Sequence, residues 1–364
     1  MGLIDELKEK LRAPAPRPPH RAKLLKGGLS SGSTLVNLAC TGDPDVAWLP
    51  GHYYLLVGDS QSGKSWLVMQ TLAEAARHPA YAKHRLVHDN TEDGTLMDVE
   101  RYFGTKLPKR LEQPPGGGPS RTVEQLYDRL ARLAADGKPY VYALDSEDAL
   151  TSAAEEKKEA RDRNARRKAG DDGADVKGSY GDGKAKLHSQ KLRVAEGRLR
   201  KDGSLLLFVK QTRDNIGFDA MFNPKTRSGG KALTFYATLE LWFSVAGKLK
   251  RPAAGKDWQV GSRLKVQVKK NRVAGLPRAV LLDHYAESGI DEVGSNVHYL
   301  VDMGAWKGTD KRVEAPEFGF SGPREKLIAM IEGAGREAEL RALVVKTWRD
   351  IEAACAVRRK PRYE

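Results

Sequence analysis

A glycine-rich segment near residue 60 constrains this chain more than any other part of its sequence. Residues 58–65 read Gly-Asp-Ser-Gln-Ser-Gly-Lys-Ser and fit the pattern G-x-x-x-x-G-K-[ST] of a phosphate-binding loop. The apolar run Tyr53–Val57 predicts a buried strand, and Trp66–Arg77 predicts a helix that begins where the loop ends. A strand, this loop and a helix in that order predict a site for a nucleoside triphosphate.

The residue types in the loop fit the chemistry of phosphate binding. Glycines let successive backbone N–H groups turn toward one point, and the start of the helix adds its positive dipole there. Lys64 would reach the β- and γ-phosphates, and the Ser65 hydroxyl would ligate Mg²⁺. The predicted nucleotide-binding residues are Gly58, Asp59, Ser60, Gln61, Ser62, Gly63, Lys64, Ser65 and, from a later strand, Asp145.

That later strand is the second feature of the predicted nucleotide site. Tyr140–Ser146 reads Tyr-Val-Tyr-Ala-Leu-Asp-Ser, so an apolar run ends at Asp145. A carboxylate in this place holds Mg²⁺ in nucleotide-binding proteins. Many α/β strands end in Asp, so the prediction depends on the phosphate loop that comes before it. Ser65 and Asp145 are the predicted metal ligands.

Charge and composition limit the possible partners. The chain has 364 residues, 40% of them hydrophobic, and its 62 Lys and Arg against 48 Asp and Glu give a formal net charge of +14. A positive excess of this size favours a polyanionic partner, and nucleic acid is the usual one. We find no apolar run long enough to span a bilayer and no signal peptide, and the two cysteines suit a reducing compartment. The sequence therefore predicts a cytoplasmic protein with no membrane partner.

Pattern and composition divide the chain into three regions. Residues 1–20 combine a short amphipathic helix (2–11) with a Pro-rich linker (13–19), and they are either a subunit-docking arm or a frayed terminus. Residues 21–287 contain the alternating strands and helices of a core. Residues 288–364 are mainly helical and predict a small C-terminal domain.

A charged insert, residues 153–183, interrupts the predicted core. It has almost no apolar residues, so it cannot pack into a core of its own. Acidic Glu155, Glu156 and Glu159 come first and basic residues follow, an order that suits the helix dipole. A solvated helix and a DNA-facing loop are both consistent with this pattern.

Three further strands are predicted after residue 230. They are Ala237–Val245, Arg263–Lys270 and Arg278–His284. Their alternation of apolar and polar residues predicts an antiparallel edge on a parallel sheet.

These segments, in this order, resemble the RecA family of DNA recombinases. The most specific stretch is Val209–Leu241, which resembles the family's strand, its second DNA-binding loop and the signature Gly-Gly-x-Ala-Leu-x-Phe-Tyr-Ala. Two further matches are Leu144–Ser146 followed by Ala149–Thr151, and Gly261–Val273.

The resemblance covers most of the chain, from about Leu29 to Trp306. It implies an α/β fold, namely a RecA-like P-loop ATPase core with a mainly parallel central sheet, a short N-terminal helix and a small helical C-terminal domain. The short N-terminal helix and the layout before the phosphate loop are more similar to the phage UvsX-type branch than to the bacterial protein.

For catalysis, the resemblance implies a carboxylate at the end of the second strand that positions the attacking water. Glu92 is the predicted residue, but Asp89 or Asp93 could serve instead because this segment has one extra residue relative to the family. Gln211 would sense the γ-phosphate, and two late cations would reach the ATP of an adjacent subunit. The predicted catalytic residues are Glu92, Lys64, Gln211, Lys270 and Arg272.

The resemblance also implies a DNA-binding segment after Gln211. DNA would be held through its phosphates, by this segment and by the charged insert, without base specificity. Two departures from the family occur elsewhere: Val99 replaces a tyrosine that stacks on adenine, and Lys210 stands where the family usually has Asn. The predicted DNA-binding residues are Arg213, Phe222, Lys225, Arg227, Gly229, Gly230 and Lys231.

Together these implications predict an ATP-dependent recombinase that uses ATP and Mg²⁺. Subunits would form a homo-oligomeric filament on single-stranded DNA, with ATP between neighbours, and exchange strands with homologous double-stranded DNA. Two alternatives are a ring-forming helicase or motor on the same core, and a DNA-coating protein in which ATP is a structural ligand.

Overall fold

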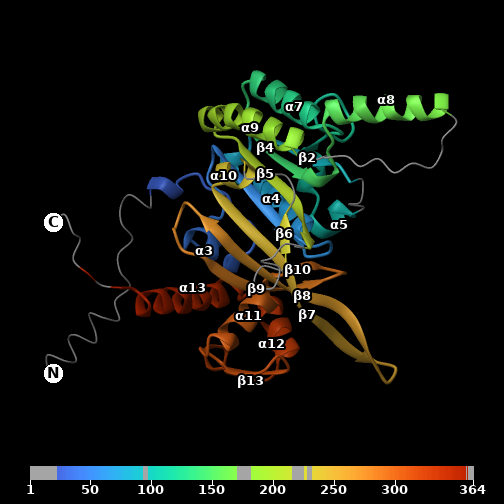
Figure 1. Cartoon of the computed structure of the whole chain (residues 1–364). Coiled ribbons are helices and arrows are strands. Elements are labelled where there is room, and N and C mark those ends of the chain that lie inside the picture. Colours follow the sequence, from blue (N-terminus) through green and yellow to red (C-terminus); the bar gives the residue numbers. More distant parts are fainter. Residues whose placement is uncertain are drawn as a thin grey trace. The chain divides into compact units, whose positions relative to one another are not determined.

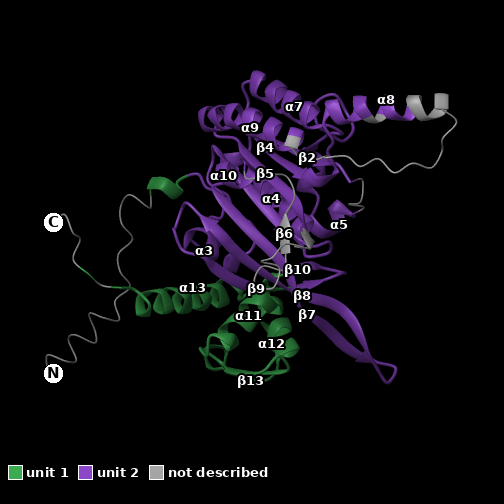
Figure 2. Cartoon of the chain, in the orientation of Figure 1, with its two compact units in different colours: residues 1–26, 281–283, 291–364 green, residues 27–280, 284–290 purple. Residues whose placement is uncertain are grey.

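The computed structural model of this chain describes residues 23–92, 97–169, 182–214, 225–227, 232–357 and 359. Two compact units can be distinguished (Figure 2). The larger unit consists of residues 27–280 and 284–290, and the smaller unit of residues 1–26, 281–283 and 291–364. The predicted N-terminal helix, residues 2–11, lies outside the described residues.

One large sheet is the framework of the fold. Its ten strands follow the order β10-β9-β8-β7-β1-β5-β4-β2-β3, with β6 paired to β5. Their bounds are β1 His52–Gly58, β2 Arg85–Asn90, β3 Leu111–Glu112, β4 Tyr140–Asp145, β5 Leu205–Asp214, β6 Lys225–Arg227, β7 Leu239–Ala253, β8 Lys256–Asn271, β9 Arg278–Tyr285 and β10 Gly289–Asp291.

The middle of this sheet is parallel. β1 pairs in parallel with β5 and β7, β4 with β5 and β2, and β2 with β3. Strands of a parallel sheet are covered on both faces and are therefore apolar along their length. The apolar runs of β1, β4 and β5 are accordingly buried. The predicted α/β fold with a mainly parallel central sheet is confirmed.

The register of these strands brings distant parts of the sequence to one edge. Gly58 at the end of β1 pairs with Gln211 of β5, and Asn90 at the end of β2 pairs with Asp145 at the end of β4. Ligands of open α/β sheets bind outside the carboxyl ends of the strands. The phosphate loop, Gln211 and Asp145 therefore lie at one edge of the sheet.

Helices pack against the sheet of the larger unit (Figure 1). α7 begins with a capping box between Thr122 and Gln125, and its Leu126 joins Leu192 of α9 and Tyr142 of β4 in one core cluster. The bounds are α3 Thr34–Thr41, α4 Lys64–Arg77, η1 Pro79–Tyr81, α5 Val99–Phe103, α6 Lys106–Arg110, α7 Val123–Ala135, η2 Glu147–Ala149, α8 Ala153–Ala169, α9 Asp182–Asp202 and α10 Ala232–Tyr236.

The charged insert contains helix α8, which projects away from the sheet in Figure 1. Glu155 and Glu156 lie in its first turn, where acidic side chains favour the helix dipole. Its described side chains are exposed or half-buried. The exposure of these described side chains agrees with a solvated helix, one of the two alternatives for the insert, and residues 170–181 lie outside the described residues.

β7 and β8 pair in the antiparallel direction that the sequence predicts for this part of the sheet, but their hairpin is much longer than predicted. Its outer half extends beyond the sheet in Figure 1 and is exposed on both faces. Such a strand needs no alternation of apolar and polar residues, so periodicity did not reveal it. The turn passes through Ala254 and Gly255, both at positive φ (48° and 72°). Trp258 near the tip is 57% exposed.

The smaller unit combines helices with a second, three-stranded sheet of order β11-β12-β13. Its helices agree with the mainly helical character predicted for residues 288–364, whereas the sequence did not predict the sheet. Its bounds are α11 Glu292–Asp302, β11 Lys307–Gly308, β12 Arg312–Ala315, η3 Pro316–Phe318, β13 Phe320–Pro323, α12 Arg324–Gly333 and α13 Glu337–Ala354. Across both units, none of the helices described is long and apolar enough to cross a bilayer.

Candidate nucleotide site

The loop between β1 and α4 has little room for side chains at the two glycine positions of its sequence pattern. Gly63 caps α4 with φ at +88°, and a Cβ there would lie 2.3 Å from Leu264 Cδ1. A Cβ on Gly58 would lie 2.5 Å from the Phe243 carbonyl oxygen. Neither position can hold a larger side chain without a shift of its neighbours. Packing thus favours glycine at both fixed positions of the sequence pattern, and at Gly63 the positive φ favours it as well.

Lys64 is held in the loop by hydrogen bonds to backbone carbonyls. Its ammonium donates to the Gly58 oxygen at 2.9 Å and to the Asp59 oxygen at 2.6 Å, and the side chain is buried. Burial lowers the pKa of Lys64, while the Asp145 and Glu92 carboxylates counteract this shift, Asp145 most strongly. The loop thus presents a positioned cation among several carboxylates, an arrangement suited to phosphate and a divalent metal.

Asp145 has the properties of a magnesium ligand. It is buried, and its Oδ2 makes no hydrogen bond, although His88 Nε2 lies 3.7 Å away. A buried carboxylate oxygen without a donor is open to a cation. Within the described residues, no group of three or more His, Cys, Asp and Glu side chains is arranged so that it could hold a metal ion. This suits Mg²⁺, which takes one or two protein ligands together with phosphate oxygens and water. The donor set of Ser65 and Asp145 therefore fits the ion.

Glu92 and Gln211 contact each other at this edge. The Gln211 side-chain amide donates to Glu92 Oε1 at 2.8 Å. The register explains the contact, since Gln211 pairs with Gly58 while Glu92 follows β2 two residues after Asn90. The Glu92 carboxylate also raises the pKa of Lys64, which indicates that the two charges are close. The structure thus brings together Lys64, Glu92, Gln211 and Asp145.

Asp89 lies in a different environment. It is fully buried and accepts hydrogen bonds from the Ser120 backbone at 2.8 Å, from the Ser120 hydroxyl at 2.6 Å and from the Tyr142 hydroxyl. Arg129 lies 3.8 Å from its Oδ1. Its side chain alternates to the opposite face of β2 from His88 and Asn90, as strand periodicity requires. Asp93, the other alternative, lies outside the described residues.

Two further residues belong to the site although the sequence analysis did not identify them. The Thr212 hydroxyl donates to Asp59 Oδ1, which ties the phosphate loop to β5. Asp148, on η2, accepts the Gln211 backbone N–H at 2.7 Å. Asp148 comes three residues after Asp145. Its position just beyond the end of a predicted apolar strand could therefore have identified it as a candidate site residue. No comparable signal marked Thr212, because its contact depends on the register of β1 and β5.

Lys270 and Arg272 lie away from the phosphate loop of their own chain. Lys270 donates to the Phe235 carbonyl at 2.9 Å, and Arg272 donates to the same oxygen at 2.7 Å, at the end of α10. Lys270 pairs with Glu240, which pairs with Leu55. It therefore sits two strands across from β1 and about 10 Å along the strands from Gly58. The structure does not bring these cations to Lys64.

The predicted DNA-binding segment begins as a continuation of the strand that carries Gln211. Arg213 lies on β5 and pairs with Thr226 of β6, whose ends are Lys225 and Arg227. Backbone pairing is all that is described of this segment. The remaining predicted DNA contacts, Phe222, Gly229, Gly230 and Lys231, lie outside the described residues.

Val99 is the first residue of α5. The same short helix carries Tyr102, whose ring meets the Trp66 ring edge-on at 4.9 Å between centroids. Trp66 directly follows Ser65 of the loop and also contacts His284 at 5.0 Å. An aromatic cluster thus borders the start of α4, although the predicted tyrosine position holds a valine.

The sequence of this chain is similar to those of known proteins. Residues 27–291 match the family model of the RecA N-terminal domain. Protein RecA of Chlorobium limicola is 29% identical over 330 residues, which cover 86% of this chain and 77% of that protein. Protein RecA of Parvibaculum lavamentivorans is 30% identical over 286 residues, covering 77% and 67%. Protein RecA of Chlorobaculum tepidum is 30% identical over 296 residues, covering 77% and 71%. The chain therefore belongs to the RecA family.

Proposed function

We propose that this chain is an ATP-dependent DNA recombinase that forms filaments on single-stranded DNA and exchanges strands with homologous double-stranded DNA. The observation that carries the proposal is the meeting of Lys64, Asp145, Glu92 and Gln211 at one edge of the sheet. Gln211 lies on the strand that continues into the predicted DNA-binding segment, so one strand would join nucleotide and DNA.

ATP would bind with its β- and γ-phosphates on the loop of residues 58–65. Lys64 would donate to phosphate oxygens, and the start of α4 would add its positive dipole. Ser65 and Asp145 would hold Mg²⁺, which neutralises phosphate charge when bound. The partnerless Oδ2 of Asp145 supports this assignment.

Glu92 would be the carboxylate that orients the attacking water. Water forms a bond to the γ-phosphorus while the bond to the β-phosphate oxygen breaks, which gives ADP and phosphate. The hydrogen bond from Gln211 fixes the Glu92 carboxylate. Asp89 is a weaker candidate, because the Tyr142 and Ser120 donors already occupy its oxygens.

Lys270 and Arg272 would act on the ATP of an adjacent subunit. Their distance from the phosphate loop of their own chain supports a role across an interface. A cation supplied this way stabilises the charge of phosphoryl transfer only when subunits are aligned. Head-to-tail repetition of such a contact gives an open filament when the rotation does not close.

DNA would be held by the segment from Arg213 to Lys231 and by the charged insert, through phosphates. The net charge of +14 supports a polyanionic partner. A protein that acts on DNA would work in the cytoplasm of a bacterial cell or a phage-infected host. The layout before the phosphate loop supports the phage UvsX-type branch, and residues 1–20 would serve as a subunit-docking arm.

Two measurements on the purified chain test the proposal. ATP hydrolysis is measured with and without single-stranded DNA, and negative-stain microscopy with strand-exchange assays follows under the same conditions. We expect DNA-stimulated hydrolysis, filaments on the DNA and exchanged strands. Closed rings would indicate a motor on the same core, and DNA coating without hydrolysis would indicate that ATP is a structural ligand.

A further inference from the structure

A buried ionic network lies behind the nucleotide site and has no part in the proposed chemistry. Lys210 of β5 and Glu147 of η2 are both fully buried and form an ion pair. Lys210 also lies 3.2 Å from Asp148 Oδ1. Isolated charges are strongly disfavoured in a protein interior. These groups must therefore stay paired with one another, or move together when one of them moves.

The network continues from Glu147 into helix α9. Glu147 Oε1 lies 2.8 Å from Lys184 Nζ and 2.8 Å from His188 Nε2. Lys184 also donates to the Glu147 and Leu150 carbonyls, at 2.8 and 2.9 Å. Although burial raises the pKa of Glu147, the His188 hydrogen bond and the two lysines lower it well below its usual range. The Glu147 carboxylate therefore stays charged. It contacts Lys210 of β5 on one side and Lys184 and His188 of α9 on the other.

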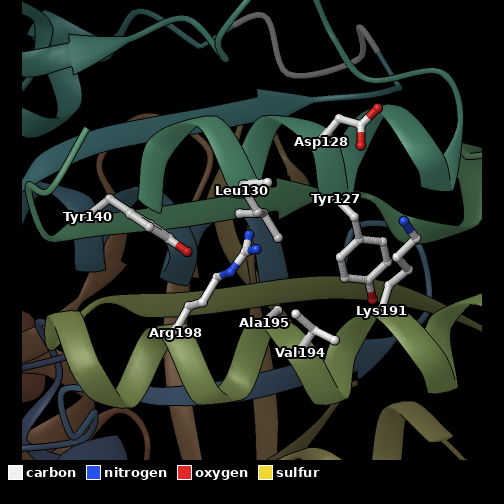
Figure 3. Close-up of a pocket in the computed structure, with 9 residues that line it drawn as sticks. Tyr127, Asp128, Leu130, Tyr140, Lys191, Val194, Ala195 and Arg198 are labelled. Carbon is white, nitrogen blue, oxygen red and sulfur yellow. The ribbon is translucent and has the colours of Figure 1, made fainter. Parts of the chain in front are cut away.

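The far end of the network is Tyr127 of α7. His188 Nδ1 lies 2.9 Å from the Tyr127 hydroxyl, and both side chains are buried. The Tyr127 ring lines a cavity of about 170 Å³ between α7 and α9 (Figure 3). The charged network thus ends in the helix layer that covers this face of the sheet.

The near end of the network holds the backbone of Gln211, the residue that would sense the γ-phosphate. Asp148 accepts the Gln211 backbone N–H through one oxygen and contacts Lys210 through the other. Gln211 in turn donates to Glu92. A change in the position of Gln211 would therefore displace Asp148 and Lys210 together.

The elements joined by this network are the two ends of the charged insert. η2 ends at Ala149, shortly before α8 begins at Ala153, and α9 begins at Asp182. Glu147 and Lys184 therefore flank the insert, and Lys210 links both to β5. An asparagine, the usual residue of the family at this position, could not supply the charge of this link.

We propose that Lys210 is a positioning residue that couples the nucleotide site to the charged insert, through Glu147, Asp148 and Lys184. The inference rests on the proposed binding of ATP and DNA. Occupation of the γ-phosphate position would set Gln211, and the ionic network would transmit that setting to both ends of the insert. The insert would then bind DNA more tightly when ATP is bound.

The coupling is measured as a ratio of two DNA affinities. The dissociation constant for a labelled single-stranded oligonucleotide is determined by anisotropy, without nucleotide and with a slowly hydrolysed ATP analogue. Couplings between two sites typically change affinity by about 5–150-fold. We expect Lys210→Met to bring this ratio close to one while DNA affinity without nucleotide stays unchanged. ADP affinity should also stay unchanged, because ADP lacks the phosphate that Gln211 would contact.

A second variant and a matched control complete the experiment. Lys184→Met cuts the same network at the insert end, where the side chain is 13% exposed and tolerates change better, and it should lower the ratio as well. Lys186→Met removes an exposed charge from the same helix and should leave the ratio at the parent value. If Lys210→Met fails to fold, Lys184→Met decides.

The outcomes separate this inference from the proposed function. If the DNA affinity of the parent protein does not change when the ATP analogue is added, the proposed function itself is contradicted. If the ATP analogue raises the DNA affinity of the parent protein and of the folded variants by the same factor, Lys210 has no role in the coupling. The network would then have a structural role only. Substitutions in it would lower the stability of the fold without changing the ratio of the two DNA affinities.

Discussion

Arg272 provides a direct test of whether neighbouring subunits share one active site. The change is Arg272→Ala, which leaves the phosphate loop intact. In the structure the Arg272 guanidinium contacts the Phe235 carbonyl, and its backbone N–H donates to the Thr238 oxygen at 3.1 Å. The variant should therefore bind ATP normally and fold, but lose DNA-stimulated hydrolysis.

The size of the loss follows from where the guanidinium lies. Asn271, just before Arg272, pairs with Leu239, and Leu239 pairs with Tyr54. From Tyr54 to Gly58 the strand rises by about 13 Å, too far for the side chain to reach its own loop. If the guanidinium serves a neighbour, its loss should lower the rate of hydrolysis by about 10³–10⁵-fold, as for other cations supplied across an interface.

The decisive assay mixes Arg272→Ala with Lys64→Ala, each inactive alone. In a head-to-tail filament of equal parts, about one interface in four joins an intact Lys64 to an intact Arg272. Steady-state hydrolysis on single-stranded DNA should therefore recover to about a quarter of the parent rate per subunit, provided that subunits mix at random.

A mixture that co-assembles on DNA without recovery would refute the shared site. Co-assembly is checked by fluorescence transfer between labelled subunits. Lys269→Ala is the matched control, because Lys269 precedes Lys270 on β8 but its ammonium lies 3.4 Å from the centre of the Trp242 ring. That variant loses a charge from the same strand and should hydrolyse ATP at the parent rate.

Three further predictions concern the nucleotide site and the insert. Lys64→Ala should stay folded in a thermal melt yet lose ATP hydrolysis and ATP-dependent DNA binding, and normal turnover would remove the nucleotide assignment. Glu92→Gln should bind ATP and DNA but hydrolyse very slowly in a phosphate-release assay. Asp89→Asn should instead lower the free energy of unfolding by about 1–3 kcal/mol, because it disturbs a buried hydrogen-bond network. If Asp89→Asn is stable but hydrolyses ATP slowly, and Glu92→Gln hydrolyses it normally, Asp89 is the catalytic carboxylate. Deleting residues 155–177 should reduce the log–log slope of DNA affinity against salt by about 0.7 per lost phosphate contact, and an unchanged slope would leave the insert a solvated surface.

Local patterns determined the parts of this protein whose conformation depends on near neighbours. Gly58 and Gly63 were predicted because a phosphate loop needs glycine at fixed spacing, and both positions are closely packed in the structure. The apolar runs of β1 and β4 were predicted because strands buried on both faces are apolar throughout. Helix α8 agrees with one of the two alternatives for the insert, a solvated helix, whose charges follow the helix dipole.

The outer half of the β7–β8 hairpin shows where local patterns carry no signal. Strands are recognised when one face is buried, and these residues are exposed on both. The three-stranded sheet of the smaller unit also gave no local signal, because its strands span only two to four residues. Their pairing partners, rather than their own composition, define them.

The carboxylate ambiguity near residue 90 shows what tertiary structure added. The sequence placed Asp89 and Glu92 close to the same strand end, and it could not order them. Strand pairing points Asp89 into the core against Tyr142 and leaves Glu92 beside Gln211. A shift of one residue reverses the face of a strand, so this choice depends on the register of β2 against β4.

The ionic network around Lys210 depends even more on the fold. Its members lie on four elements that are up to about eighty residues apart in sequence, and no spacing rule joins them. The sequence by itself determined the phosphate loop, the order of strands and helices, and hence the family. The tertiary structure decided which charges meet in the interior, because an ion pair such as Lys210 with Glu147 forms only after parallel strands and their covering helices have excluded water.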